Sequence, residues 1–115
     1  MKNKYLFAYG MFRESAKLEL GNVINCGIST IPGKIYKVNN FYPGFKQTND
    51  GSLVVGNVYL LESADIFTKL DEFEGDEYFR KKIIASNDIE CWVYEYRYDV
   101  KNFNEIVSGD WLIRI

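Results

Sequence analysis

The sequence contains no histidine among its 115 residues. Histidine is the one side chain whose ordinary pKa puts its titration near neutral pH. Proton transfer at that pH must therefore fall to a carboxylate, a lysine, a tyrosine or a cysteine with a shifted pKa. A nucleophilic serine activated by histidine is excluded for the same reason, and Ser15 is not a catalytic candidate.

Cysteine is almost as scarce. Cys26 and Cys91 are far apart in the sequence and neither belongs to a C-x-x-C motif. A structural zinc site needs about four cysteine or histidine ligands, so we expect no metal. Both cysteines are expected to be small buried hydrophobic residues in a reducing compartment, although a single disulfide stays open on sequence grounds.

Charge of one sign and long apolar runs are also missing. The formal net charge is −2, and the only basic run is Arg80-Lys81-Lys82, which excludes nucleic-acid binding. Neither a Gly-x-Gly-x-x-Gly pattern nor a P-loop is present to bind a nucleotide. The apolar run at the N-terminus is too short for a signal peptide, and no segment has the roughly 20 apolar residues of a membrane span. We expect a soluble, cytoplasmic protein without membrane contact.

Aromatic residues are abundant, at 17% of the chain, which favours a strand-rich fold over disorder. We expect a single domain over residues 1–115. Strands are predicted at 5–9, 23–28, 34–38, 52–61, 83–85 and 89–98, and helices at 15–20 and 63–74. Residues 39–51 are predicted to be mostly loop, with a short extended piece at Phe45. The fold class is α+β, a small mixed or antiparallel sheet with one or two flanking helices; the pattern allows a closed barrel but does not require one.

Local signals refine these elements. Ser63 is predicted to cap the second helix, with Asp65 in its first turn and Gly75 at its end. Its apolar stripe is Ile66, Phe67, Leu70 and Phe73. Gly56 within a strand predicts a bulge or a close backbone approach, and Ser86-Asn87-Asp88 predicts a hairpin turn. The tail 102–115 is predicted to be extended, with Trp111 and Leu112 in the core.

Glu74 is the leading catalytic candidate. It falls in the last helical turn, where unpaired carbonyl groups and the helix dipole disfavour an anion. The neighbouring rings of Phe73, Tyr78 and Phe79 could remove water from the carboxylate, and both effects would raise its pKa. The alternative is a solvated glutamate on an acidic surface, one of a group with Asp71, Glu72, Asp76 and Glu77.

The segment after the first strand is a second candidate site. Gly10 allows a sharp turn that presents the backbone N–H groups of residues 10–13 to a carboxylate or an oxyanion, although an ordinary turn is the commoner outcome. Other polar residues are weaker candidates. Lys34 and Lys46 are expected to be solvated, and Tyr94 and Tyr96 are expected to pack in the core with satisfied hydroxyl groups.

Five motifs occur in a fixed order: Tyr9-Gly10-Met11-Phe12-Arg13, Gly56-Asn57-Val58-Tyr59, Leu70 to Gly75 with Tyr78 and Arg80, Trp92-Val93-Tyr94, and Ser108-Gly109-Asp110-Trp111. In this order and spacing the chain resembles the gamma-glutamylcyclotransferase-like (AIG2-like) superfamily over nearly its whole length. The resemblance implies a compact barrel with flanking helices. It also implies cyclisation of a small γ-glutamyl amine or peptide to 5-oxoproline, with release of the amine and without metal or cofactor.

The resemblance also implies roles for individual residues. Glu74 matches the family's catalytic acid/base, and Tyr9, Gly10, Met11 and Phe12 match the stretch whose backbone amides hold the substrate. Tyr78 is the expected aromatic wall near Glu74. Arg80 is expected to pair with a carboxylate rather than to touch substrate.

One departure from the family pattern keeps other functions open. Met11 and Phe12 stand where the family usually has a small hydroxyl residue followed by leucine, so a hydroxyl is lost and bulk is added at the pocket mouth. A non-catalytic module that binds γ-glutamyl or 5-oxoproline-like molecules is therefore an alternative. A γ-glutamyl acyltransferase is another. The sequence does not indicate the amine half of the substrate or the oligomeric state.

Overall fold

The structure, a computed structural model, describes residues 3–13 and 20–113. Its strands are β1 (Tyr5–Ala8), β2 (Val23–Pro32), β3 (Lys34–Val38), β4 (Tyr42–Lys46), β5 (Leu53–Leu61), β6 (Tyr78–Ile84), β7 (Glu90–Tyr96) and β8 (Asn104–Glu105). The described elements also include the α-helix α2 (Ile66–Glu74) and two short 3-10 turns, η1 (Gly75–Glu77) and η2 (Trp111–Ile113). Phe12, Arg13 and Leu20 are helical as well. The helix predicted at 15–20 falls outside the described residues, apart from Leu20.

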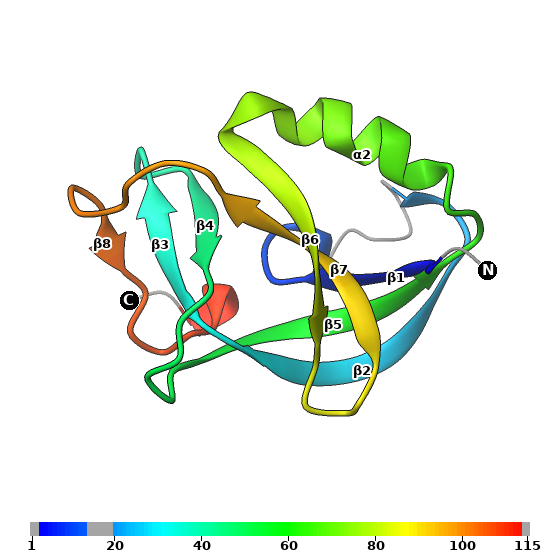
Figure 1. Cartoon of the computed structure of the whole chain (residues 1–115), viewed down its shortest axis with the longest axis horizontal. Coiled ribbons are helices and arrows are strands. Elements are labelled where there is room, and N and C mark those ends of the chain that lie inside the picture. Colours follow the sequence, from blue (N-terminus) through cyan, green and yellow to red (C-terminus); the bar gives the residue numbers. More distant parts are fainter. Residues whose placement is uncertain (1–2, 14–19, 114–115) are drawn as a thin grey trace.

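The strands form one curled sheet in the order β2-β5-β1-β7-β4-β3-β8, with β6 also paired to β7 (Figure 1). β7 runs parallel to β1 and to β4, and the other pairs are antiparallel, so the sheet is mixed. Only Gly33 separates β2 from β3, yet these strands lie near opposite ends of the strand order. The sheet must therefore curl, and it forms a half-barrel. The predicted α+β class is confirmed.

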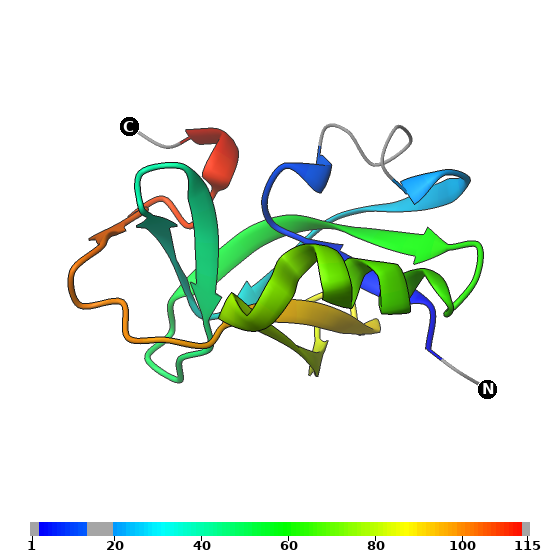
Figure 2. The ribbon, with the colours of Figure 1, turned by 90° about the horizontal axis from the view of Figure 1, so that it is seen from above.

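β1 is buried on both of its faces. Leu6 and Ala8 pack in the cluster that contains Phe67 and Leu70 of α2, which lies across this side of the sheet (Figure 2). Phe7 packs on the other side, in a cluster with residues of β2, β3, β4, β5 and β7. A strand covered on both faces needs apolar residues at every position, which explains its continuous apolar run. Each large side chain buried in this way contributes about 1.5–3 kcal/mol.

Gly56 marks the close approach that the sequence predicts. A Cβ atom added there would lie 2.5 Å from the carbonyl oxygen of Ala8 and 2.6 Å from the ring of Phe7. β5 also pairs with β2 on its other side, and the irregularity of that pairing lies in β2, between Asn25 and Ile28. Glycine at 56 thus lets β5 pack directly against β1, below the loop that follows β1.

The helix α2 begins later than predicted. The Ser63 hydroxyl accepts a hydrogen bond from the N–H of Asp65 (3.1 Å), so it stabilises the turn before the helix, and Asp65 is the N-cap residue. Phe67 and Leu70 are buried as predicted, but Phe73 is 66% exposed. Gly75 ends the helix at a φ of 71°, as predicted. This left-handed conformation is the one that favours glycine.

Two further predictions are wrong in part. Residues 42–46 form β4, which pairs along its whole length with β3, instead of lying in a long loop. Pro43 and Gly44 hide this strand, because both residue types are depleted in strands. In the tail, Trp111 is buried as predicted, whereas Leu112 is 43% exposed because it lies on the outer side of η2.

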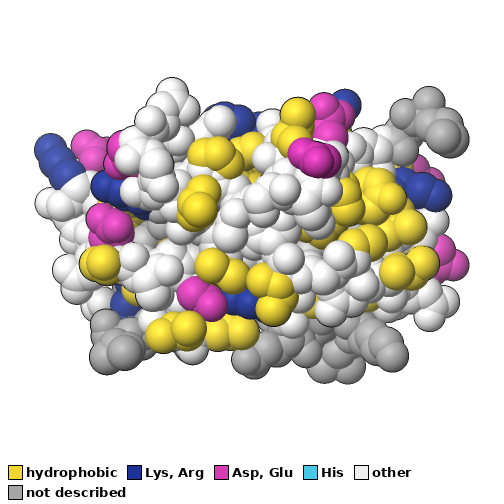
Figure 3. Space-filling model, turned by 90° about the horizontal axis from the view of Figure 1, so that it is seen from below, with side chains coloured by type: hydrophobic (Ala, Val, Ile, Leu, Met, Phe, Trp, Pro, Cys, Tyr) yellow, Lys and Arg dark blue, Asp and Glu magenta, His cyan; other side chains and the backbone are white. Residues whose placement is uncertain are grey.

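The remaining predictions can be compared directly. The turn at residues 86–88 joins β6 to β7, and the N–H of Asp88 donates to the carbonyl of Ala85 (2.9 Å). Cys91 is buried, Cys26 is half-buried, and both are free thiols. In the part of the chain that the structure describes, no helix is long and apolar enough to cross a membrane. On the face shown in Figure 3, described acidic and basic side chains are scattered among hydrophobic ones.

Candidate active site

A cavity of about 330 Å³ opens between the end of β1, the start of β4 and the end of α2. Six residues were singled out from the sequence as a site. All six line this cavity: Tyr9, Gly10, Met11, Phe12, Glu74 and Tyr78. Segments that are more than sixty residues apart in the sequence thus come together in one place. Their roles in catalysis and binding stay predictions.

Glu74 is a half-buried carboxylate in this cavity. Burial raises its pKa from an ordinary 4.5 to about 7, because the ionised form loses contact with water. Within residues 3–13 and 20–113, no group donates a hydrogen bond to the Glu74 carboxylate, and none forms an ion pair with it. Phe73 and Tyr78 form part of the wall, as expected. Phe79 does not line the cavity, and its ring packs against the Arg97 guanidinium (5.5 Å).

Three tyrosines around Glu74 have hydroxyl groups that are already bonded to the protein. Tyr78 Oη donates to the Pro43 carbonyl (2.7 Å), and Tyr9 Oη donates to the Tyr94 carbonyl (2.6 Å). Tyr94 Oη donates to Asp71 Oδ1 (2.7 Å). Burial, and then the nearby charge of Glu74, raise the pKa of Tyr78, so its ring is a neutral wall. These bonds hold the walls of the cavity in place.

The loop after β1 forms the other wall. The N–H of Arg13 donates to the Gly10 carbonyl (3.1 Å), so this donor is used within the turn and does not belong to the predicted cradle. A Cβ atom on Gly10 would lie 2.8 Å from the Pro43 ring, which shows how closely β4 approaches the loop. Met11 is 59% exposed at the mouth. The cavity of about 330 Å³ is present with methionine in this position.

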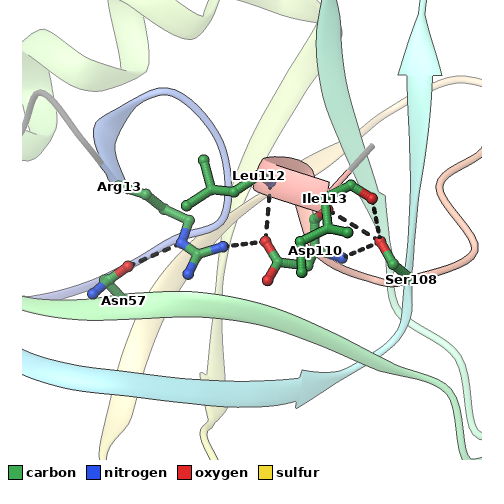
Figure 4. A network of polar contacts seen from close by, with 6 residues as sticks. All are labelled: Arg13, Asn57, Ser108, Asp110, Leu112 and Ile113. Carbon is green, nitrogen blue, oxygen red and sulfur yellow. Dashed lines mark hydrogen bonds and ion pairs between the residues drawn. The ribbon is translucent and has the colours of Figure 1, made fainter. Parts of the chain in front are cut away.

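A buried polar network fixes the loop to the C-terminal segment (Figure 4). Arg13 Nη1 donates to Asp110 Oδ1 (2.5 Å), and Arg13 Nε donates to Asn57 Oδ1 (2.9 Å). Only 4% of the Arg13 side chain is exposed, and 16% of that of Asp110. Tyr59 Oη also donates to the Arg13 carbonyl (2.9 Å). Three of the five sequence motifs thus meet at one ion pair beside the cavity.

The other charged candidates lie outside the cavity. Arg80 pairs with Asp71, as expected, with its Nε 3.1 Å from Oδ1 and its Nη2 3.1 Å from Oδ2. Its guanidinium lies 4.4 Å from the centre of the Trp92 ring. Lys34 pairs with Asp50 (3.3 Å) at the surface, so it is not simply solvated.

The remaining weak candidates are aromatic or lie against aromatic rings. Tyr96 is buried, as expected, and does not line the cavity. Lys46 lies over its ring, with Nζ 5.9 Å from the ring centre. Tyr94 is also buried, but its ring forms part of the cavity wall.

Sequence reasoning missed several residues of the cavity. Glu77, which was grouped with the solvated acids, lines it, as do Tyr42 and Trp111. Glu77 follows Glu74 by three residues through a 3-10 turn, and this spacing places two side chains on one side. That spacing was the available signal. Tyr42 had none, because its strand was not recognised. Across the described residues, no three carboxylates or thiols come together as a possible metal site.

Comparison with known proteins identifies the family. Residues 6–113 match the model of the gamma-glutamyl cyclotransferase, AIG2-like family, and the chain therefore belongs to this family. None of the curated proteins matches the sequence.

Solved structures share the fold. The solution structure of the protein ytfP from Escherichia coli is 30% identical, covers 96% of this chain and 97% of its own, and has a TM-score of 0.73. An AIG2-like protein from Mus musculus is 17% identical, covers 97% of this chain and 84% of its own, and has a TM-score of 0.71. An uncharacterized protein from Pyrococcus horikoshii has a TM-score of 0.77 at 18% identity, with 93% and 88% covered.

Proposed function

We propose that this protein is a gamma-glutamylcyclotransferase-like enzyme that converts a small γ-glutamyl amide to 5-oxoproline and releases the free amine. The observation that carries the proposal is Glu74. It is a carboxylate in a cavity, without a partner among the described residues, whose pKa burial raises to about 7. A group of this kind takes and returns protons near neutral pH.

The reaction needs positioning more than strong chemical activation. The α-amino nitrogen of the substrate attacks its own γ-carbonyl carbon, a C–N bond forms, and the bond to the leaving nitrogen breaks. Both reacting ends belong to one molecule, so holding them in contact can supply roughly 7–11 kcal/mol of the barrier reduction. The cavity of about 330 Å³ is large enough to enclose a folded γ-glutamyl group, and its aromatic walls limit the access of water.

Glu74 provides the proton route. The ionised carboxylate accepts a proton from the attacking amine and then donates it to the leaving nitrogen. With a pKa of about 7, roughly half of the molecules are ionised at neutral pH, so both directions are accessible. No net proton or water is consumed. General acid–base catalysis of this type contributes about a hundred- to ten-thousand-fold in rate.

The loop after β1 is assigned to bind the negatively charged groups of the substrate. Among the described lining residues there is no lysine or arginine, so the backbone N–H groups of residues 10–12 are assigned to the α-carboxylate or to the oxyanion. Gly10 makes this approach possible because a side chain there would collide with Pro43. Tyr78 supplies a rigid wall beside Glu74.

The experiment is an assay of 5-oxoproline release from a panel of γ-glutamyl amides and dipeptides. The wild type should release 5-oxoproline from at least one of them, with an acidic limb of the pH–rate profile near pH 7. Glu74→Gln should lower kcat by about a hundredfold or more, whereas Glu72→Gln, an exposed acid on the same helix, should leave it unchanged. Binding without release would identify a binding module, and an active Glu74→Gln would remove the assigned role.

A further inference from the structure

We propose that Glu77 is a specificity-determining residue, which selects leaving amines that carry a positive charge at their far end. The inference rests on the proposed cyclisation, because it concerns the half of the substrate that is released. Its substrate class is the γ-glutamyl amides of short diamines. Amides whose far end is a carboxylate are disfavoured.

The charges of the cavity are of one sign. Glu74 and Glu77 are the only charged residues among the described residues that line it. Glu77 forms no ion pair with any described residue. Arg97 donates its backbone N–H to the Glu77 carbonyl (2.7 Å), but its guanidinium bonds to the Asp76 carbonyl (2.8 Å) and packs on Phe79. Two carboxylates between low-dielectric walls create a negative potential that attracts a cation.

Among the described side chains of the cavity wall, the carboxylates of Glu74 and Glu77 can still accept hydrogen bonds from a ligand. Tyr78, Tyr9 and Tyr94 donate their hydroxyl protons to the protein. Tyr42 Oη donates to Glu77 at 3.1 Å and 3.3 Å from its two oxygens, which orients this carboxylate. A carboxylate has about four lone-pair sites, so Glu77 keeps acceptor capacity for a second donor. An ammonium group, with three donors, matches that capacity.

Aromatic rings complete the subsite. Tyr42 and Phe41 line the cavity beside Glu77, and the rings of Tyr42 and Tyr78 pack with their centres 6.4 Å apart. Phe41 is 81% exposed and belongs to the rim. A cation over such rings is attracted to their electron-rich faces, and the attraction is stronger when water is removed. Alkyl carbons of a diamine also pack well on these surfaces.

The test uses three γ-glutamyl amides that differ in one end group. Their amines are 1,4-diaminobutane, n-pentylamine and 5-aminopentanoate, which place an ammonium, a methyl or a carboxylate at the same position. In the wild type, kcat/KM should fall about tenfold from the ammonium to the methyl amide, and further for the carboxylate. In Glu77→Gln the three kcat/KM values should come within about threefold of one another.

Controls separate this inference from the proposed function. Glu72→Gln removes the same charge outside the cavity and should keep the order. Glu74→Gln allows dissociation constants of the intact amides to be measured by calorimetry, and these should show the same order without turnover. If wild type releases 5-oxoproline equally from all three amides, the role of Glu77 is refuted and the cyclisation stands. If no amide is cyclised, the proposed function fails. Equal dissociation constants of the three amides for Glu74→Gln would then refute the Glu77 subsite as well.

Discussion

The carboxylate of Glu74 lines the cavity, that of Asp110 does not, and the fold surrounds the two groups differently. Asp110 receives hydrogen bonds from the Arg13 guanidinium and from the N–H of Leu112 (3.0 Å). Glu74 receives none from the described residues, and burial raises its pKa to about 7. A partly buried carboxylate can therefore stabilise the fold or remain available for proton transfer. The donors around it, not its depth alone, decide between these roles.

The largest effect on stability is expected at Arg13. Arg13→Leu should lower the free energy of unfolding by about 3–5 kcal/mol, because it leaves the Asp110 carboxylate buried without its partner. The exposed pair between Lys34 and Asp50 is the control, and Lys34→Met should lower the free energy of unfolding far less. Urea unfolding of the two variants gives both values. Equal losses would show that the Arg13 pair is no more important than a surface pair.

Replacing Glu74 is expected to raise the free energy of unfolding, in contrast to replacing Arg13. Its pKa is 4.5 when exposed and about 7 in the fold, so the folded protein binds more protons than the unfolded chain between these values. Stability therefore falls as pH rises from 4.5 to 7 and stays low above 7. Glu74→Gln removes this penalty and should raise the free energy of unfolding at pH 8 by up to roughly 3 kcal/mol. At pH 4 the two proteins should unfold alike, and an equal difference at both pH values would contradict the assignment.

A smaller effect is expected at Asp71, one turn before Glu74 on α2. Asp71→Asn weakens the pair with Arg80 and the hydrogen bond from Tyr94. Since 43% of the Asp71 side chain is exposed, the loss of unfolding free energy should be only about 1 kcal/mol. The release of 5-oxoproline should fall far less than in Glu74→Gln. If both variants lose the same activity, the two acids of this helix do not have separate roles.

The pattern of apolar residues predicts most of the sheet and the helix α2. Strong strand signals occur in β1, β3, β5 and β7. β4 was missed because Pro43 and Gly44 suppress its propensity, although pairing with β3 stabilises it. Phe73 was placed in the core by its helical spacing. In the structure it lies at the mouth of the cavity, where its ring packs against Phe12 at 6.1 Å between centres. Periodicity predicts a face of the helix but not where the neighbouring layer ends.

The ordered motifs made part of the site predictable, because the six site residues taken from the family resemblance all line one cavity. The sequence suggests two causes for a raised pKa of Glu74, the helix end and removal from water, and the structure supports removal from water by burial. Glu77 and Tyr42 depend on how η1 and β4 fold toward each other, which no local pattern contains. The network of Arg13, Asn57 and Asp110 also joins distant motifs, and only the fold shows that they meet.

The most direct test of this account is an NMR titration of the Glu74 side-chain carboxyl carbon, with Glu74→Gln used to assign the signal. If burial sets the pKa of Glu74, the midpoint lies near pH 7, well above the ordinary value of 4.5. A midpoint near 4.5 would show that Glu74 is an ordinary solvated acid and would contradict its role as the proton-transfer group of the cavity.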